Sequence, residues 1–449
     1  MSGDWYPPST VDALAGRQVL VLGLGLHGGG IGATRFLSRV GATVTVTDLA
    51  SAERLQPALD QIAGLEARLV LGEHREDDVL AADLVIRSPA VPDHHPLLRL
   101  AADRGIPVDS EHGLFLNLCP SHRRIGITGS KGKTTTTRMV GRIMRRAGLP
   151  HVAIGNLHLS GLDVLDQTNA DTIVLAELSS QQIASVGPRP PRYQIAVLTN
   201  LYPDHLEAHG SEEAYVEAKT RLFRALDPGG EAFIHRDTGW SDAVALQTTA
   251  PVFRFDSSDL PDHWDVGAEG QHNRANAAAA LLVARSLGIR DAISRDAIKT
   301  YSGEPHRLEQ VRVADGVAWI DDSLAGIPEA TVAAFATLSS PIIWIVGGRD
   351  KGRDLHELGT AIRGRLVAAV LLPGTGQQRL QPLLRGVATR EAATIDEAVL
   401  IASQIATPGQ TVLYSSPFGR AATLAPRPGQ GRDHQYAAGR EFQEAVARL

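Results

Sequence analysis

The sequence has 449 residues, of which 43% are hydrophobic and 21% are charged, a balance typical of a globular chain with roughly two to four domains. The formal net charge is −6 and no long basic run occurs, which argues against a nucleic-acid-binding surface. Cys119 is the only cysteine, no signal peptide is recognisable and no apolar run reaches the ~18 residues of a membrane span, so we expect a cytoplasmic protein without disulfides or a membrane partner.

Residues 18–48 predict a strand, a glycine turn, a helix and a second strand. Gln18–Leu22 is a buried-strand run, Gly23-Leu-Gly-Leu-His-Gly28 is the turn, and residues 42–48 form a strand that ends in an acid. This pattern is typical of dinucleotide-binding folds, although the same turn also occurs where a helix only packs on a sheet. Asp48, at the carboxyl end of its strand, is placed to accept hydrogen bonds from a ribose or a base.

Alternating elements continue to residue 109. Strands are expected at 68–72, 82–87 and 105–109, with a helix at 97–104. Strand–helix alternation predicts a parallel sheet. Residues 117–122, which include a proline, are expected to be a linker.

The most informative stretch is residues 125–137. A short strand, Arg124–Thr128, leads into Gly129-Ser-Lys-Gly-Lys-Thr134, and a helix is expected to follow. Glycines let backbone N–H groups face phosphate oxygens, while Lys133 can reach the β- and γ-phosphates and the Thr134 hydroxyl can ligate Mg²⁺. The usual spacing would place a glycine at 127, where Ile127 stands, so the loop is a shorter variant; the alternative is an ordinary surface turn.

Two further strands end in polar side chains. Residues 172–177 end in Glu177, and residues 194–199 are followed by Asp204 and His205. Ligands of open parallel sheets lie at the carboxyl ends of strands, so these groups are expected to meet the phosphate loop, with Glu177 as a candidate Mg²⁺ ligand. The alternatives are a helix-capping acid and a surface histidine.

Two helices carry further candidates. Lys219 lies on a helix expected over residues 212–226, where a lysine is usually just solvated. The stretch Gly270-Gln-His-Asn-Arg-Ala-Asn276 opens an apolar helix, whose first turn offers amides and free N–H groups to a ligand; plain capping by Asn273 is the alternative. A third α/β block follows, with strands expected at 317–322, 342–348, 367–372 and 411–415 and a helix at 441–449.

Together these motifs resemble the Mur ligases, the ATP-dependent amide-forming enzymes of peptidoglycan precursor synthesis, along essentially the whole chain. The first glycine turn and Glu177-Leu-Ser-Ser-Gln-Gln182 are similar to the glutamate-adding branch of that family. The shared signatures are, in chain order, Gly129-Ser-Lys-Gly-Lys-Thr-Thr135, Glu177-Leu-Ser-Ser180, Asn200 with Asp204-His205, Lys219, Gly270–Asn276, Pro305-His-Arg307, Asp321-Asp-Ser323 and Gly347-Gly-Arg-Asp-Lys351.

The resemblance implies an α/β fold of three domains. Residues 1–118 would be a Rossmann-like domain that binds the UDP-linked substrate, residues 119–303 a central P-loop-type ATP-binding domain with a parallel sheet, and residues 304–449 a Rossmann-like domain that binds the incoming amino acid. The implied reaction adds glutamate to UDP-N-acetylmuramoyl-L-alanine through an acyl phosphate, in a cytoplasmic monomer that serves cell-wall synthesis, cell shape and division. ATP, two Mg²⁺ ions and a carbamylated lysine would take part.

The resemblance also implies residue roles. Catalysis would fall to Lys133, Glu177, His205 and a carbamylated Lys219, and the metal ligands would be Thr134, Glu177, His205 and Lys219. ATP would be bound by Gly129, Ser130, Lys131, Gly132, Lys133, Thr134, Thr135, Asn273, Asn276, Arg307 and Asp322. The UDP-linked substrate would meet Leu26, His27, Asp48 and Ser179, and glutamate would meet Lys351 and Ser416.

The sequence departs from the family pattern mainly where the amino acid would bind. Leu324-Ala-Gly-Ile327 stands where D-glutamate enzymes commonly have Lys-Ala-Thr-Asn, and Ser130-Lys131 replaces Thr-Asn in the phosphate loop. A carboxylate removed from water needs donors, so we expect Arg420, Arg432 or His434 to serve the second glutamate carboxylate.

Several alternatives stay open. L-glutamate could replace D-glutamate in the same reaction. A folylpolyglutamate synthase-like ligase would lack the first glycine-rich block. An NAD-dependent oxidoreductase would leave Lys133, Glu177 and His205 without a role, and a nucleotide-binding regulator without catalysis would not need Lys219 or Arg307.

Overall fold

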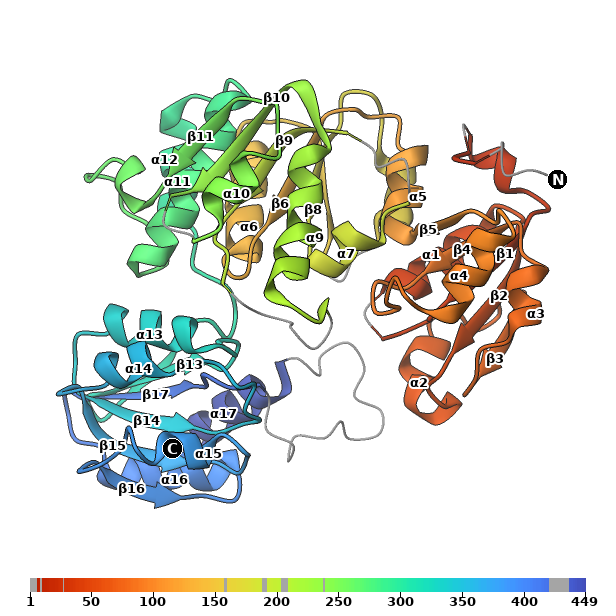
Figure 1. Cartoon of the computed structure of the whole chain (residues 1–449). Helices are drawn as coiled ribbons and strands as arrows, with labels where there is room; N and C mark the ends of the chain where they lie inside the picture. Colours follow the sequence, from red (N-terminus) through yellow and green to blue (C-terminus); the bar gives the residue numbers. More distant parts are fainter. Residues whose placement is uncertain are drawn as a thin grey trace. The chain divides into compact units, whose positions relative to one another are not determined.

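The computed structural model describes residues 6–8, 10–26, 28–156, 160–187, 192–202, 209–236, 239–419 and 436–449. Its strands form three sheets, each associated with helices (Figure 1). Contacts divide the chain into two compact units: a first unit of residues 1–266 and 274–300, which holds two sheets, and a second unit of residues 267–273 and 301–449, which holds the third. The predicted α/β class is therefore confirmed, while the three domain boundaries stay a prediction.

The first sheet is parallel throughout, in the order β3-β2-β1-β4-β5. Helices α1 and α2 pack on one face, and helices α3 and α4 on the other. The bounds are β1 Gln18–Leu22, α1 Gly29–Arg39, β2 Thr43–Asp48, α2 Ala52–Leu59, β3 Ala67–Leu71, α3 Glu76–Leu80, β4 Leu84–Arg87, α4 Pro96–Asp103, β5 Val108–Ser110 and α5 Glu111–Leu118, after a 3₁₀ turn at Val11–Leu14.

The second sheet is also parallel, in the order β11-β10-β9-β6-β8-β7. Because β6 lies between β8 and β9, the carboxyl ends of these three strands meet at one edge. The bounds are β6 Arg124–Thr128, α6 Lys133–Arg146, β7 His151–Gly155, β8 Ile173–Glu177, α7 Ser180–Ser185, β9 Tyr193–Leu198, α9 Glu212–Arg224, β10 Leu226–His235, α10 Ser241–Ala245, β11 Val252–Phe255, α11 Gln271–Ser286 and α12 Asp291–Lys299, with 3₁₀ turns at Gly161–Asp163, Leu165–Gln167 and Ser257–Asp259.

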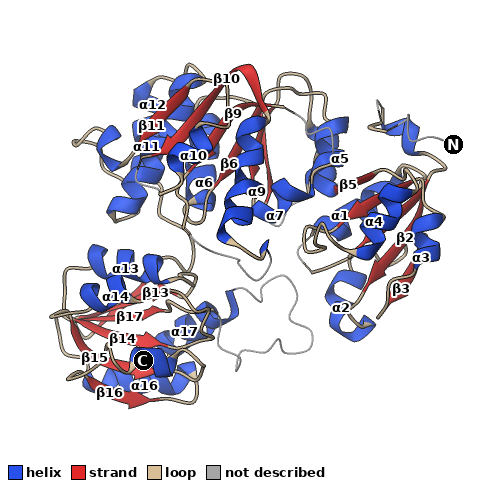
Figure 2. Cartoon of the chain, in the orientation of Figure 1, coloured by secondary structure: helices blue, strands red, loops and turns tan. Residues whose placement is uncertain are grey.

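The third sheet has the order β12-β13-β17-β14-β15-β16, and only the edge strand β12 runs antiparallel. Helices α13 and α14 cover one face and α16 and α17 the other (Figure 2). The bounds are β12 Glu309–Ala314, β13 Val317–Asp322, α13 Pro328–Thr337, β14 Ile342–Val346, α14 His356–Ala361, β15 Leu366–Leu371, α15 Gln377–Leu380, β16 Ala388–Glu391, α16 Ile395–Ile405, β17 Thr411–Ser415 and α17 Ala437–Ala447.

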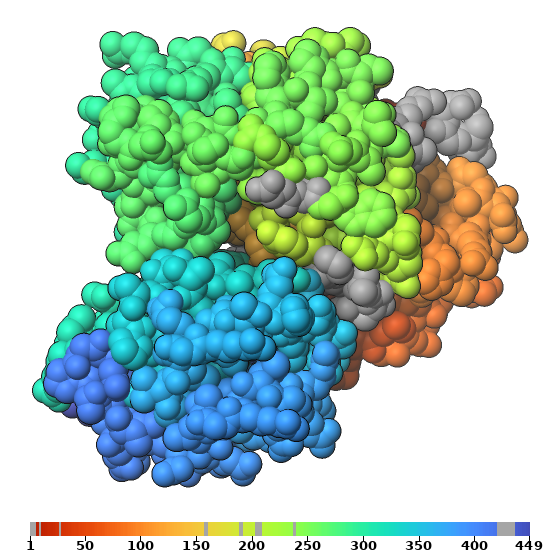
Figure 3. All heavy atoms as spheres, turned by 60° about the vertical axis from the view of Figure 1, so that its left-hand side comes forward, coloured from red at the N-terminus to blue at the C-terminus, as the bar shows by residue number. Residues whose placement is uncertain are grey.

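Burial explains why these segments form strands. Strands covered on both faces read as continuous apolar runs, as in Ile342–Val346, where every residue is buried. Figure 3 draws all heavy atoms as spheres and shows one face of the molecule, with the C-terminal third of the chain in cyan to blue. Among the residues described, no helix is long and apolar enough to cross a membrane.

The expected linker at 117–122 is more ordered than its composition suggests. Helix α5 extends through Leu118, and the buried guanidinium of Arg124 donates to the carbonyls of Leu116 and Ser121 at 2.7 and 3.0 Å. Arg124, the first residue of β6, thus fixes the position of residues 116–121 through hydrogen bonds.

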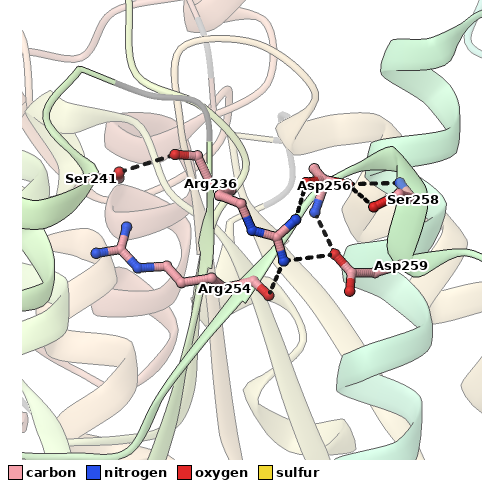
Figure 4. A network of polar contacts seen from close by, with 6 residues as sticks. All are labelled: Arg236, Ser241, Arg254, Asp256, Ser258 and Asp259. Atoms are coloured by element: carbon pink, nitrogen blue, oxygen red, sulfur yellow. Dashed lines mark hydrogen bonds and ion pairs between the residues drawn. The ribbon is translucent and has the colours of Figure 1, made fainter.

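A polar network closes the carboxyl ends of β10 and β11 (Figure 4). Arg236 pairs with Asp256 and Asp259, and Asp256 accepts the backbone N–H of Ser258 at 2.7 Å. These ion pairs lie at the surface, where each contributes only about 0–1 kcal/mol. We therefore interpret the network as a cap of the 3₁₀ turn at Ser257–Asp259.

Candidate functional site

The phosphate loop joins β6 to α6 at the meeting point of the three strand ends. Gly132 is the residue before the helix, with φ of 83°, and a Cβ there would overlap the Asn276 side-chain amide. Glycine is therefore required both by the left-handed backbone and by the close approach of α11. Helix α6 begins at Lys133, so the backbone N–H groups of its first turn lie next to the loop. This arrangement is suited to binding phosphate.

Two predicted lysines converge on one carbonyl of this loop. Lys133 Nζ donates to Gly129 O at 2.7 Å and to Ser130 O at 3.0 Å, and Lys219 Nζ donates to Gly129 O at 3.0 Å and lies 3.3 Å from Thr128 Oγ1. Lys219 is only 1% exposed and its ammonium lies 4.8 Å from the centre of the Tyr215 ring. The interpretation of Lys219 as a solvated surface lysine is therefore wrong.

Glu177 lies at the end of β8 with a fully buried carboxylate. Its Oε1 accepts the Thr134 hydroxyl at 3.0 Å and the Asn156 amide at 2.9 Å. No described residue provides a hydrogen-bond partner for its buried Oε2. A carboxylate oxygen without a partner, next to a hydroxyl at a helix N-terminus, fits a hard cation such as Mg²⁺.

Residues not assigned to the site from sequence hold the loop in place. Asn200 accepts the Lys131 N–H at 2.8 Å and donates to the Lys131 carbonyl at 2.9 Å. The Ser130 hydroxyl lies 2.8 Å from the Tyr215 hydroxyl. Asn200 belongs to a family signature and could have been selected on that ground, whereas Tyr215 carries no signal in the sequence.

Helix α11 places the two predicted asparagines differently. Asn276 is buried beside the loop, with Oδ1 accepting the Thr136 hydroxyl at 3.3 Å. The Asn273 side-chain amide donates to the Glu269 carbonyl, ahead of the helix, at 2.8 Å. A ligand role for either stays a prediction.

Arg307 and Asp322 lie in the second unit. Asp322 accepts the Leu308 N–H at 3.2 Å and the Ser415 hydroxyl at 2.7 Å, and burial raises the pKa of its carboxyl to about 7. Burial, followed by the nearby Arg307 charge, lowers the pKa of His272 to about 4. Burial thus favours the neutral form of the Asp322 carboxyl.

The two residues expected to bind glutamate lie after β14 and β17. Ser416 donates to Gly347 O at 2.5 Å and accepts the Phe418 N–H at 3.2 Å, and Lys351 Nζ lies 3.5 Å from Gly326 O. Their ligand roles stay predictions. Arg420, Arg432 and His434 lie outside the described residues, as do His27 and His205.

In the first sheet, Asp48 holds the glycine turn. Its carboxylate accepts the Gly25 N–H at 3.0 Å and the Ala50 N–H at 2.8 Å, and Leu26 is half-buried in that turn. Ser179 caps α7 by accepting the Gln182 N–H at 3.2 Å. A cavity of about 530 Å³ in this unit, lined by Arg87, Asp109 and Val186 among others, includes none of the predicted site residues.

Three family models match the chain in order. The Mur ligase MurD-like N-terminal domain matches residues 17–110, the Mur ligase middle domain residues 127–260, and the Mur ligase glutamate ligase domain residues 306–418.

Curated relatives match over most of their length. A UDP-N-acetylmuramoylalanine–D-glutamate ligase of a Roseiflexus species is 40% identical over 90% of this chain and 94% of its own, and one of Symbiobacterium thermophilum is 34% identical over 89% and 92%.

Solved structures share the fold at lower identity. The UDP-N-acetylmuramate–alanine ligase of Thermotoga maritima is 17% identical with a TM-score of 0.60, covering 96% of this chain and 99% of its own. The MurF ligase of the same organism, in complex with ADP, is 17% identical with a TM-score of 0.55, covering 98% and 97%.

Asp322→Asn should change how stability depends on pH. The carboxyl takes up its proton at a higher pH when folded than when unfolded, so between about pH 4 and 7 folding is favoured by low pH, and this contribution is lost as the pH rises through 7. The asparagine variant lacks the titration, so its thermal midpoint relative to wild type should rise from pH 5 to pH 8. Glu444→Gln, at an exposed site, is the control, and a constant difference for Asp322→Asn across that range would contradict the assignment.

Proposed function

The chain belongs to the Mur ligase family, and we propose that it uses ATP to join D-glutamate to the carboxylate of UDP-N-acetylmuramoyl-L-alanine in peptidoglycan precursor synthesis. The observation that carries the proposal is the convergence of Lys133, Thr134 and Glu177 at one sheet edge, in a chain that matches D-glutamate ligases along nine-tenths of its length.

The first step transfers a phosphoryl group. A carboxylate oxygen of the muramoyl-alanine substrate attacks the γ-phosphorus of ATP, the bond to ADP breaks, and an acyl phosphate forms. Negative charge spreads over the transferred oxygens, and the Lys133 ammonium and the N–H groups at the start of α6 are placed to stabilise it.

The second step forms the amide. The uncharged amino group of glutamate attacks the acyl carbon, a tetrahedral intermediate forms and loses a proton, and inorganic phosphate leaves. Water must be excluded from the acyl phosphate, because hydrolysis would waste ATP.

Magnesium would be held by the Thr134 hydroxyl and Glu177, with His205 and a carbamate on Lys219 as the further ligands implied by the family. A bound Mg²⁺ supplies charge neutralisation and orientation of the phosphates. Glu177 Oε2, buried and without a described partner, supports this assignment.

We assign one of the three substrates to each of the three predicted domains. We assign the UDP-linked substrate to residues 1–118 through Leu26, His27 and Asp48, with Ser179 at its muramoyl-alanine end. ATP is assigned to residues 119–303 through the 129–135 loop and Asn276, with Asn273, Arg307 and Asp322 as further contacts. Glutamate is assigned to residues 304–449 through Lys351 and Ser416.

The assignment of the amino acid rests on the relatives, because Leu324, Gly326 and Ile327 provide no charged donors for its second carboxylate. The relatives that match are named for D-glutamate, and we adopt that enantiomer. Recognition of the second carboxylate by Arg420, Arg432 or His434 remains a proposal.

The test of function is phosphate release with ATP, UDP-N-acetylmuramoyl-L-alanine and each glutamate enantiomer. We expect turnover with D-glutamate and a loss on the order of 10²-fold or more for Lys133→Ala, because a donor to the transferred phosphoryl is removed. Arg145→Ala, at an exposed position of the same helix, is the matched control. Turnover with L-glutamate alone would reverse the enantiomer assignment, and wild-type turnover by Lys133→Ala would remove the loop from the mechanism.

Lys219 should carry a carbamate. Wild-type protein in ¹³C-bicarbonate should show a carbamate resonance that Lys219→Ala lacks, and the variant should lose most of its activity. Short carboxylic acids should restore part of that activity, because they place a carboxylate in the space left by the lysine. Absence of the resonance from active wild-type enzyme would refute the modification.

Asp48→Ala should weaken binding of the UDP-linked substrate and leave ATP affinity unchanged. The carboxylate holds the glycine turn through the Gly25 N–H, and it belongs to a different sheet from the phosphate loop. Calorimetric titration with each nucleotide measures the two effects, with Asp60→Ala as an exposed control. Equal losses for both nucleotides would show that the first sheet has been assigned to the wrong ligand.

A further inference from the structure

The turn around Arg307 has an unusual backbone. His306 and Leu308, on either side of it, have φ of 61° and 47°, values that L-residues other than glycine seldom adopt. Such residues persist only when their surroundings fix them. Here each N–H is held by a carboxylate: the His306 N–H donates to Glu309 at 2.8 Å and the Leu308 N–H to Asp322 at 3.2 Å.

Gln443, on helix α17, joins the carboxylates behind this turn. Its amide nitrogen lies 2.9 Å from Glu309 Oε2 and 3.0 Å from Asp321 Oδ2. An amide has two protons on nitrogen and can serve both acceptors, whereas the reverse orientation would set its oxygen against two carboxylate oxygens. The side chain of Asp321 in turn contacts His306 Nδ1 at 2.7 Å.

This arrangement explains a cluster that otherwise looks like a metal site. The ligand atoms of His306, Glu309 and Asp321 lie within 4.8 Å of one another. The Gln443 nitrogen lies 2.9 to 3.2 Å from an atom of each, so a neutral donor occupies the position that a cation would need.

Helix α17 packs closely against the 306–308 turn because it carries a glycine at the contact. A Cβ on Gly439 would overlap His306 and Asp321, so only glycine lets the helix come this close. Gly439 and Gln443 are four residues apart and therefore lie on one face of the helix. The ring of Tyr436, just before the helix, stacks on His306 with centroids 5.2 Å apart.

We propose that Gln443 is a positioning residue for nucleotide binding: it holds Glu309 and Asp321, they fix the 306–308 turn, and the turn presents Arg307 to the nucleotide. The proposal rests on the proposed function in assigning Arg307 to ATP. It gives Gln443, on helix α17, an indirect role in the nucleotide site through the 306–308 turn.

The test is ADP binding by calorimetry to the full chain, with thermal midpoints as a check on folding. Gln443→Leu keeps the size of the side chain but removes both donors to carboxylates, so we expect ADP affinity to fall about tenfold or more. The KM for ATP should rise while the KM values for glutamate and the UDP-linked substrate stay unchanged. Glu444→Leu, exposed on the same helix, is the matched control.

A double-variant cycle separates positioning from a general loss of stability. If Gln443 acts through Arg307, Gln443→Leu should cause no further loss of ADP affinity in an Arg307→Ala background. An additive loss, an unchanged ADP affinity in Gln443→Leu, or an Arg307→Ala variant that binds ADP normally would each overturn the proposal. Because ADP binding needs neither glutamate nor the UDP-linked substrate, a failed ligation assay leaves this result interpretable.

Gln443→Glu provides a second route should the leucine variant fold poorly. This substitution places a third carboxylate next to those of Glu309 and Asp321, and the like charges repel one another. ADP affinity should therefore fall further than in Gln443→Leu. Adding Asp321→Asn places an amide donor opposite the new carboxylate and keeps the Glu309 oxygen that accepts the His306 N–H, so ADP affinity should partly recover. No recovery in a folded double variant would contradict the hydrogen-bond pairing on which the proposal depends.

Discussion

Two lysine side chains donate to one backbone oxygen, the carbonyl of Gly129, and this convergence is the main electrostatic constraint on the candidate site. Two ammonium groups this close repel each other, the more strongly because Lys219 is buried. Negative charge beside the loop relieves that repulsion. The phosphates of ATP would supply it from one side, and a carbamate on Lys219 would turn one of the two like charges into an opposite one.

The geometry that brings these groups together comes from strand order. Placing β6 between β8 and β9 sets Thr128, Glu177 and Thr199 at neighbouring strand ends. Asn200 then holds the loop at Lys131, and Asn276 accepts the Thr136 hydroxyl in helix α6. Among the described residues of the candidate site, strand ends and the first turn of α6 hold several of the side chains, which favours a rigid geometry.

The parts of this arrangement that the sequence predicted are those with local signals. The glycine loop, the acidic end of β8 and the polar first turn of α11 each give a signal in a few consecutive residues, and the structure has them where they were expected. Lys219 could be predicted as a site residue only from the family resemblance. Its neighbours Glu213 and Glu217 give the helix a polar character, and its ammonium contacts Thr128 and Gly129, which are distant in sequence. The hydrogen bond between Ser130 and Tyr215 joins residues 85 positions apart, so no local sequence pattern predicts it. Strands β7, β10, β11, β12 and β16 were not expected either; several of them are edge strands, whose partial exposure weakens the apolar pattern.

The order of strands in the third sheet affects how the chain can fold while it is being translated. Strands β13 and β14 are not paired with each other; β17, formed by residues 411–415, lies between them. Because the ribosome synthesises the chain from its amino end, Trp319 and Ile343 can pair with Val412 only after a further 93 and 69 residues have been made. Such delayed pairing is slow and leaves apolar strands exposed in the meantime. The nascent second unit should therefore be the part of this protein that most needs a chaperone.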